Sequence, residues 1–126
     1  MKQEIVEIIE QNTFFLATKG TCGNPRIRPM RSIVVDGDKL YFCTKKGKNL
    51  VKHIQNFSGV ELCIFDNKRT WLRIRGEAKV IEKQDFSEKL QKIFKDSSAD
   101  LVIFGLDKMS IKLQDLDGRE EVYQYE

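Results

Sequence analysis

The chain has 126 residues, 40% of them hydrophobic and 33% charged, which favours one globular domain over residues 1–126 and excludes a disordered or fibrous chain. Its net charge is only +3, which argues against a nucleic-acid binder and makes the placement of the cations more informative than their sum. No apolar stretch approaches the ~20 residues of a membrane span, and the glutamates near the N-terminus are not typical of a signal peptide. The three cysteines and the one histidine lack metal-ligand spacing, so we expect a cytoplasmic protein without a metal site.

The first half of the chain has the pattern of a helix, three strands and a second helix. Ile5, Ile8 and Ile9 recur on one side of the first helix with glutamates opposite, which predicts a lid over an apolar core. Gly-rich and Asp-Gly segments between the strands favour hairpin turns. The expected elements are a helix over residues 2–12, strands over 13–19, 25–35 and 39–44, and a helix over 47–57.

The second half is dominated by strands. In the longest, over residues 70–82, Leu72 and Ile74 face one side while Trp71 and Arg73 face the other. The order of elements, rich in hairpins, predicts a mainly-β (α+β) fold: an antiparallel closed or nearly closed barrel with peripheral helices. The other expected elements are strands over 59–66, 101–106, 108–116 and 121–125, and a helix over 85–95 that begins with a capping box of Asp85 and Glu88.

Cations gather where a strand leads into a helix. Arg26 and Arg28 alternate on the second strand, and a hydroxyl and three lysines follow the third strand as the next helix begins. Cations, a hydroxyl and the free backbone N–H groups of a helix start are the groups that bind a phosphate. The sequence therefore predicts a site for a phosphorylated ligand. The residues of the second group are Thr44, Lys45, Lys46 and Lys48.

Five short segments carry a further signal through their order and spacing. They are Phe15-Leu16-Ala17-Thr18, Pro25-Arg26-Ile27-Arg28-Pro29-Met30, Leu40-Tyr41-Phe42-Cys43-Thr44, Lys48-Asn49-Leu50 and Trp71-Leu72-Arg73-Ile74-Arg75-Gly76. Together they resemble the pyridoxamine 5'-phosphate oxidase-like FMN-binding split barrels, in particular the short members related to general stress proteins and nitroimidazole-reductase-like proteins. The resemblance implies a six-stranded antiparallel split β-barrel that forms a homodimer with FMN at the dimer interface.

The resemblance also implies which residues hold the cofactor. Backbone groups of Pro29 and Met30 would face the isoalloxazine ring, and Trp71, together with Arg73, would approach from the partner subunit. Relatives often carry a hydroxyl residue in the loop where this chain has Lys46-Gly47, so we expect one side-chain donor to be missing and a cation to replace it. By the same resemblance, we expect this protein to lack the C-terminal segment that completes the substrate site of true pyridoxamine phosphate oxidases and therefore not to oxidise vitamin B6. The residues expected around the phosphate and ribityl chain are Arg28, Thr44, Lys45, Lys46, Lys48 and Asn49.

The remaining candidates have structural interpretations. His53 flanks the apolar stripe of its helix without a second ligand nearby, so we expect it to be structural. Cys43 is expected to be a buried strand residue, and Cys22, in a Gly-rich turn, to be exposed. No pair of carboxylates suits acid–base chemistry, so we assign no catalytic residue.

The expected function is that of an FMN-binding oxidoreductase, an NAD(P)H-linked reductase or oxidase of an unidentified small molecule, in which the flavin carries the hydride chemistry. Two alternatives stay open. A flavin- or haem-binding sensor or storage protein would hold a chromophore without turnover. A small basic barrel would bind single-stranded nucleic acid through Trp71, Arg73, Arg75 and the lysine loop, although the acidic first helix argues against it.

Overall fold

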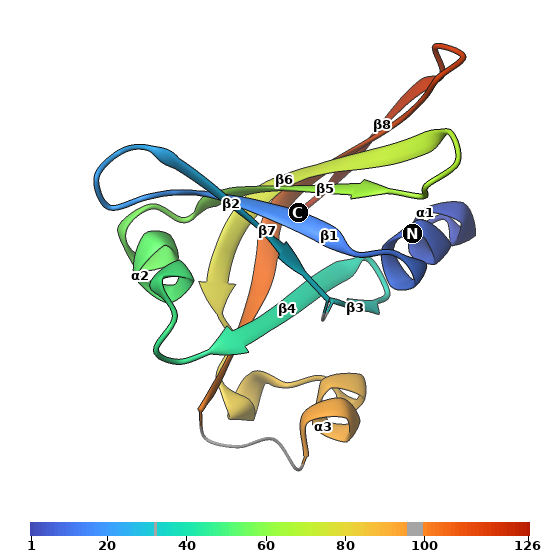
Figure 1. Ribbon diagram of the computed structural model, residues 1–126. Helices are drawn as coiled ribbons and strands as arrows, with labels where there is room; N and C mark the ends of the chain where they lie inside the picture. Colours follow the sequence, from blue (N-terminus) through green and yellow to red (C-terminus); the bar gives the residue numbers. More distant parts are fainter. Residues whose placement is uncertain (32, 96–99) are drawn as a thin grey trace.

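The computed structural model describes residues 1–31, 33–95 and 100–126. In that part, eight strands form one antiparallel sheet with three α-helices around it (Figure 1). The predicted mainly-β antiparallel barrel with peripheral helices is confirmed. The helices are α1 (Gln3–Gln11), α2 (Asn49–Asn56) and α3 (Glu88–Phe94), with a 3-10 turn η1 (Lys83–Asp85) before α3. The strands are β1 (Phe14–Lys19), β2 (Pro25–Met30), β3 (Ile33–Asp36), β4 (Lys39–Lys45), β5 (Gly59–Phe65), β6 (Thr70–Val80), β7 (Leu101–Asp115) and β8 (Glu120–Tyr125).

The sheet is closed by a short step in the chain. Its strand order is β2-β1-β5-β6-β7-β4-β3, with β8 beside β7. The two outermost strands of this order, β2 and β3, are consecutive in the sequence, so the chain crosses from one edge to the other just after Met30. A sheet whose two edges are joined in this way has to curl into a barrel.

The prediction of one strand over residues 25–35 was wrong. Position 32 lies outside the described residues, and on either side of it the chain forms two strands with different partners. Met30 pairs with Phe14 of β1, whereas Ile33 pairs with Phe42 of β4. One straight strand cannot pair with both edges of a curled sheet, and the alternation of side chains does not reveal which partner a strand takes.

The prediction of separate strands over residues 101–106 and 108–116 was also wrong, because β7 is continuous. Lys108 has a positive φ of 50°, and the register of β6 against β7 shifts between Arg75 and Glu77. These are the marks of a β-bulge, which bends a strand without ending it. The bend lets β7 pair with β6, β4 and β8.

The third helix begins later than the sequence predicted. Ser87 is its N-cap, and its Oγ accepts a hydrogen bond from the backbone N–H of Leu90 at 3.3 Å. Asp85 instead ends η1, and Phe86 has an extended backbone between the two elements. The capping box of Asp85 and Glu88 is therefore wrong, because an extended residue separates them and Ser87 takes the capping role.

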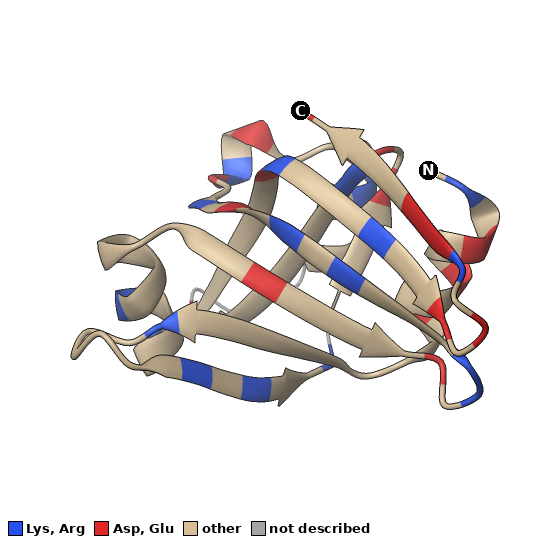
Figure 2. Ribbon diagram, turned by 90° about the horizontal axis from the view of Figure 1, so that it is seen from above, with Lys and Arg blue, Asp and Glu red and all other residues tan. Residues whose placement is uncertain are grey.

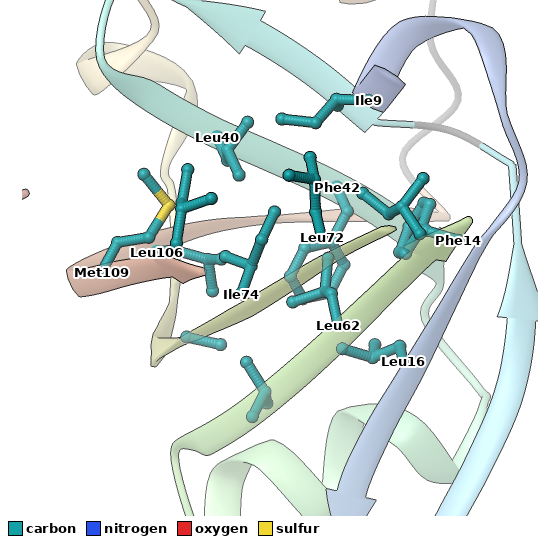
Figure 3. Packing of buried hydrophobic residues seen from close by; sticks show 14 of the residues in the cluster. Ile9, Phe14, Leu16, Leu40, Phe42, Leu62, Leu72, Ile74, Leu106 and Met109 are labelled. Atoms are coloured by element: carbon teal, nitrogen blue, oxygen red, sulfur yellow. The ribbon is translucent and has the colours of Figure 1, made fainter. Parts of the chain in front are cut away.

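The core fills the barrel interior with aliphatic and aromatic side chains (Figure 3). Leu62, Leu72 and Ile74 of the central strands are fully buried. Ile9 of α1 reaches the same core, and the predicted apolar face of that helix is confirmed because Ile5 and Ile8 are buried beside it. The first helix therefore covers one end of the barrel. Across the described ranges, no helix combines the length and apolar character that a membrane crossing requires.

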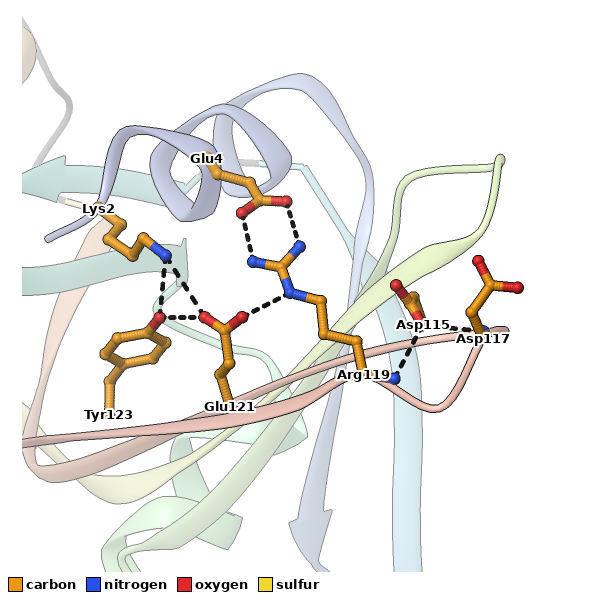
Figure 4. A network of polar contacts seen from close by, with 7 residues as sticks. All are labelled: Lys2, Glu4, Asp115, Asp117, Arg119, Glu121 and Tyr123. Carbon is orange, nitrogen blue, oxygen red and sulfur yellow. Dashed lines mark hydrogen bonds and ion pairs between the residues drawn. The ribbon is translucent and has the colours of Figure 1, made fainter.

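A polar network fastens α1 to the last hairpin (Figure 4). Arg119 donates two hydrogen bonds of 2.9 Å to the carboxylate of Glu4 and one of 2.5 Å to Glu121. Tyr123 donates to Glu121, and Lys2 donates to Tyr123 at 3.2 Å. The hydrogen bond from Arg119, followed by that from Tyr123, lowers the pKa of Glu121 to about 2. The network joins the two ends of the sequence on the side of the barrel away from α2.

Candidate anion-binding site

A cavity of about 740 Å³ lies between the β1–β2 hairpin, the end of β4 and the start of α2. This volume is within the range of small-molecule sites, about 300–1,000 Å³. Six of the residues expected to hold a phosphorylated cofactor line it, although they come from three elements. They are Arg28, Pro29, Met30, Thr44, Lys48 and Asn49. The sequence therefore predicted which segments meet here, and the binding role of these residues stays a prediction.

The cavity is strongly basic. Five of its lining residues carry a positive charge, and among the residues described none of its lining side chains is an Asp or Glu. Figure 2 shows the cations of β2 as blue bands on that strand. No ion pair within the described part of the chain joins these five cations to a carboxylate, so their charge is available to an anionic ligand. The five are Arg26, Arg28, Arg31, Lys48 and Lys52.

Neutral groups hold the guanidinium of Arg28. Its Nη1 donates to the carbonyl oxygen of Leu16 at 3.1 Å and to the hydroxyl of Thr18 at 2.8 Å. Its Nη2 lies 3.3 Å from Nδ1 of His53. Partial burial lowers the pKa of Arg28, with a smaller contribution from Arg26; at an arginine this leaves the charge in place.

His53 and Thr18 form the buried side of this arrangement. The side chains are 7% and 4% exposed, and the Thr18 hydroxyl lies 2.9 Å from Nδ1 of His53. Burial lowers the pKa of His53, and the charges of Arg28 and Arg26 lower it further. The imidazole is therefore neutral at physiological pH.

The sequence predicted a structural role for His53, and its buried hydrogen bonds agree with that role. Its place in the cavity wall was not foreseen, and Thr18 was not singled out as a polar group of the site. One signal was available, because His53 follows Asn49 by four residues and so lies on the same face of α2.

The start of α2 supplies backbone donors beside these side chains. Lys48 is the N-cap residue, and its side chain makes no capping hydrogen bond. The first N–H groups of a helix have no partner within the helix and carry its partial positive charge. Thr44, at the end of β4, lines the same cavity. A cation, a hydroxyl and an uncapped helix start therefore meet here, as the spacing of the sequence predicted.

The structure separates two of the predicted lysines from this cavity. Lys45 and Lys46 line an adjoining hollow of about 420 Å³ together with Lys48 and Asp100. The backbone N–H of Lys46 donates to the carbonyl oxygen of Asp100 at 2.6 Å. Among the described residues, Lys48 is the one that borders both spaces. The binding role expected for Lys45 and Lys46 stays a prediction.

Trp71 and Arg73 lie elsewhere, on the outer face of β6. Trp71 pairs with Phe65 and Gln114 on the neighbouring strands, and Arg73 lies 3.9 Å from the carboxylate of Glu61. Neither lines the cavity of its own chain. The resemblance implied a contribution to the partner's site, and that role stays a prediction.

The two cysteines near the cavity differ from each other. Cys22 is exposed, as predicted, and lines the cavity mouth; Arg26 donates to its sulfur at 3.7 Å. Cys43 was expected to be buried, but it is only half-buried and also lines the cavity. Its side chain lies on the same face of β4 as Tyr41 and packs against the smaller apolar cluster of Tyr41, Leu90 and Ile103.

Comparison with solved structures identifies the class of fold. A NimC/NimA family protein from Clostridium acetobutylicum matches with a TM-score of 0.80 at 22% identity, over 99% of this chain and 92% of that one. General stress protein 26 from Bacillus anthracis matches with a TM-score of 0.71 at 17% identity, over 98% and 97%. An FMN-binding protein related to pyridoxamine 5'-phosphate oxidase, from Nostoc punctiforme, gives 0.64 at 16%, over 98% and 91%. The fold is the split barrel of these proteins.

A comparison of the sequence with protein families assigns the chain to one family within this class of fold. The family model described as pyridoxamine 5'-phosphate oxidase matches residues 1–115. The chain therefore belongs to the pyridoxamine 5'-phosphate oxidase family. Among curated proteins, none matches this sequence.

Proposed function

We propose that this protein is an FMN-dependent oxidoreductase that binds FMN in the basic cavity between β2, β4 and α2. The observation that carries the proposal is a cavity with five cations, no lining carboxylate among the residues described and an uncapped helix start at its edge. A phosphomonoester supplies the negative charge that such a site lacks. The family match and the FMN-binding relative from Nostoc punctiforme support the choice of FMN over other phosphorylated ligands.

In this proposal the chain's own residues divide into two groups. Lys48, Thr44 and the first N–H groups of α2 bind the phosphate together with Arg28. Backbone groups of Pro29 and Met30, at the end of β2, face the ring. Bound flavin supplies hydride transfer between NAD(P)H and a small molecule, so the protein needs no acid–base pair of its own.

We propose further that the protein acts as a homodimer. The outer face of β2, β1, β5 and β6 carries apolar side chains that the chain itself leaves exposed, among them Ile27 (69%), Phe15 (43%) and Phe65 (42%). A second copy would cover this apolar patch. Trp71 and Arg73 lie on this face and would then approach the partner's cavity.

The first experiment is a visible absorption spectrum of the purified protein before and after addition of FMN, followed by a fluorescence titration with FMN and with riboflavin. We expect stoichiometric binding of FMN and much weaker binding of riboflavin, because only FMN carries the phosphate. A protein that ignores both flavins would overturn the proposal. Reduction of the bound flavin by NADH or NADPH then separates an enzyme from a flavin-binding sensor or store.

The alternative of a nucleic-acid-binding barrel has less support. It relied on Trp71, Arg73, Arg75 and the lysine loop. On the outer face of β6, Glu61 lies 3.9 Å from Arg73 and 4.0 Å from Arg75. A carboxylate between two arginines lowers the attraction of that face for a phosphate backbone.

A further inference from the structure

We propose that Thr18 and His53 are positioning residues that hold Arg28 toward the cavity with its charge uncompensated, and that His53 does so as a neutral imidazole protonated on Nε2. The identity of the anion as FMN rests on the proposed function. The protonation state of His53 does not depend on a bound ligand, so it is tested without any flavin.

Arg28 needs these hydrogen-bond partners because it lies on an outer strand. Within the described residues, β2 is an outer strand of the sheet that pairs with β1 alone, and most of its side chains are exposed. A free arginine side chain in such a place loses much conformational freedom when it binds a ligand. Hydrogen bonds formed before the ligand arrives remove part of that cost.

The donors of Arg28 can be accounted for one by one. An arginine has five N–H donors. Both of those on Nη1 are used by Leu16 and Thr18, and one on Nη2 points to His53. The second hydrogen on Nη2 and the one on Nε have no acceptor among these three groups. They are the pair available to a phosphate oxygen.

The acceptors that hold Arg28 are a carbonyl, a hydroxyl and an imidazole, and none of them is charged. Arg119 shows the contrast within the same chain, because Glu4 and Glu121 neutralise it on both sides. A carboxylate at the position of His53 would fix Arg28 equally well but would cancel its attraction for an anion. Neutral acceptors fix the side chain and leave its charge for the ligand.

The protonation state of His53 follows from the geometry. Arginine has no acceptor, so the contact of 3.3 Å between its Nη2 and Nδ1 of His53 requires a lone pair on Nδ1. The Thr18 hydroxyl accepts from Arg28 and so has its own hydrogen to donate to the same Nδ1, at 2.9 Å. The ring proton is therefore on Nε2. A protonated Nδ1 would direct a hydrogen at the guanidinium.

Because His53 is the only histidine in the chain, its ring gives a single set of imidazole signals. We expect the nitrogen-15 spectrum at neutral pH to show an unprotonated Nδ1 and a protonated Nε2. A proton on Nδ1, or a charged ring, would overturn the proposed arrangement.

Two matched pairs of variants test the positioning role, with inorganic phosphate and FMN as the probes. His53→Leu removes the acceptor, whereas His53→Asn offers Oδ1 close to the position of Nδ1. We expect His53→Leu to weaken binding of both probes roughly tenfold and His53→Asn to restore most of the affinity. Thr18→Val removes the hydroxyl at constant shape and Thr18→Ser keeps it, so this pair repeats the test if a His53 variant does not fold.

The decisive test introduces His53→Leu into a protein that already carries Arg28→Met. If His53 acts through Arg28, His53→Leu will have no further effect on phosphate affinity once Arg28 is methionine. An equal loss in both backgrounds would mean a merely structural role and would overturn the proposal. If the unmodified protein binds phosphate but not FMN, the FMN proposal fails and the positioning role stands. If it binds neither, the positioning role for an anion fails as well.

Discussion

The rings of Phe14 and Phe42 meet edge to face across the barrel interior, with centroids 6.4 Å apart. Their strands, β1 and β4, are not neighbours in the sheet. Phe42 also stacks on Phe104 of the adjacent strand β7, at 5.4 Å, and all three side chains are buried. This aromatic cluster therefore packs one side of the curled sheet against the other.

Removal of this contact should open a cavity at the centre of the barrel. We expect Phe42→Ala to lower the free energy of unfolding by about 3–5 kcal/mol, measured by urea denaturation. Leu116→Ala is the control, because that side chain is 69% exposed and should change stability by less than about 0.5 kcal/mol. Similar losses in both variants would contradict a role for the cluster in closing the barrel.

Lys48 is the cation common to the main cavity and the adjoining hollow. A charge-assisted hydrogen bond is worth roughly 1.5–3 kcal/mol, so Lys48→Ala should weaken FMN binding by about one to two powers of ten in a fluorescence titration. Lys68→Ala, in the β5–β6 turn, changes net charge equally and should leave the affinity almost unchanged. Unchanged affinity in Lys48→Ala would remove this residue from the site.

The proposed dimer has a simple test at Ile27, the most exposed apolar side chain of the outer face. An aspartate in the middle of an apolar interface is buried without a partner, so Ile27→Asp should give a monomer in analytical ultracentrifugation. The fold should persist, because Ile27 is 69% exposed. Ile93→Asp, on α3, is the matched control and should leave the oligomeric state as it is. A monomeric unmodified protein would refute the dimer outright.

The hydrogen-bond network around Arg119 predicts that the stability of the folded protein decreases in acid. Its hydrogen bond holds the pKa of Glu121 at about 2, below the ordinary value of 4.5. A carboxylate with a lowered pKa in the folded state stabilises the protein above its unfolded pKa, and this contribution is lost as pH falls from 4.5 toward 2.

Arg119→Met should therefore lower the melting temperature at pH 7 and have a smaller effect near pH 2. Thermal unfolding followed by circular dichroism at both pH values gives the comparison. Glu77→Gln, which removes a carboxylate from the exposed pair with Lys108, serves as the control. A constant difference between Arg119→Met and the unmodified protein across this pH range would exclude a titrating contribution from the network.

Gly76 lies in β6 where the register against β7 shifts. A Cβ at this position would come within 3.1 Å of the carbonyl oxygen of Asp107, so the two strands would have to separate slightly. We expect Gly76→Ala to destabilise the protein by about 1–3 kcal/mol in chemical denaturation. Gly47→Ala has open space around the new methyl group and should be close to neutral. A neutral Gly76→Ala would show that the bulge tolerates the added atom.

Most of the elements, and the meeting of Arg28 with Thr44 and Lys48, were predictable from the sequence. Helices and hairpins follow from local periodicity and from turn residues, which act over a few positions. The groups proposed to bind phosphate stand next to each other in one strand-to-helix segment, and Arg28 comes from a recognisable second segment. Local sequence patterns were therefore sufficient to predict most of the elements and the meeting of these residues.

The tertiary structure alone decided how the sheet closes and what supports the cavity. Alternating side chains show which face a residue occupies but not which strand pairs with it, so the division between β2 and β3 and the continuity of β7 were missed. His53 and Thr18 are 35 positions apart and meet only because α2 packs on β1. Contacts between distant segments depend on the closed barrel as a whole, and this is the physical reason that no local pattern reveals them.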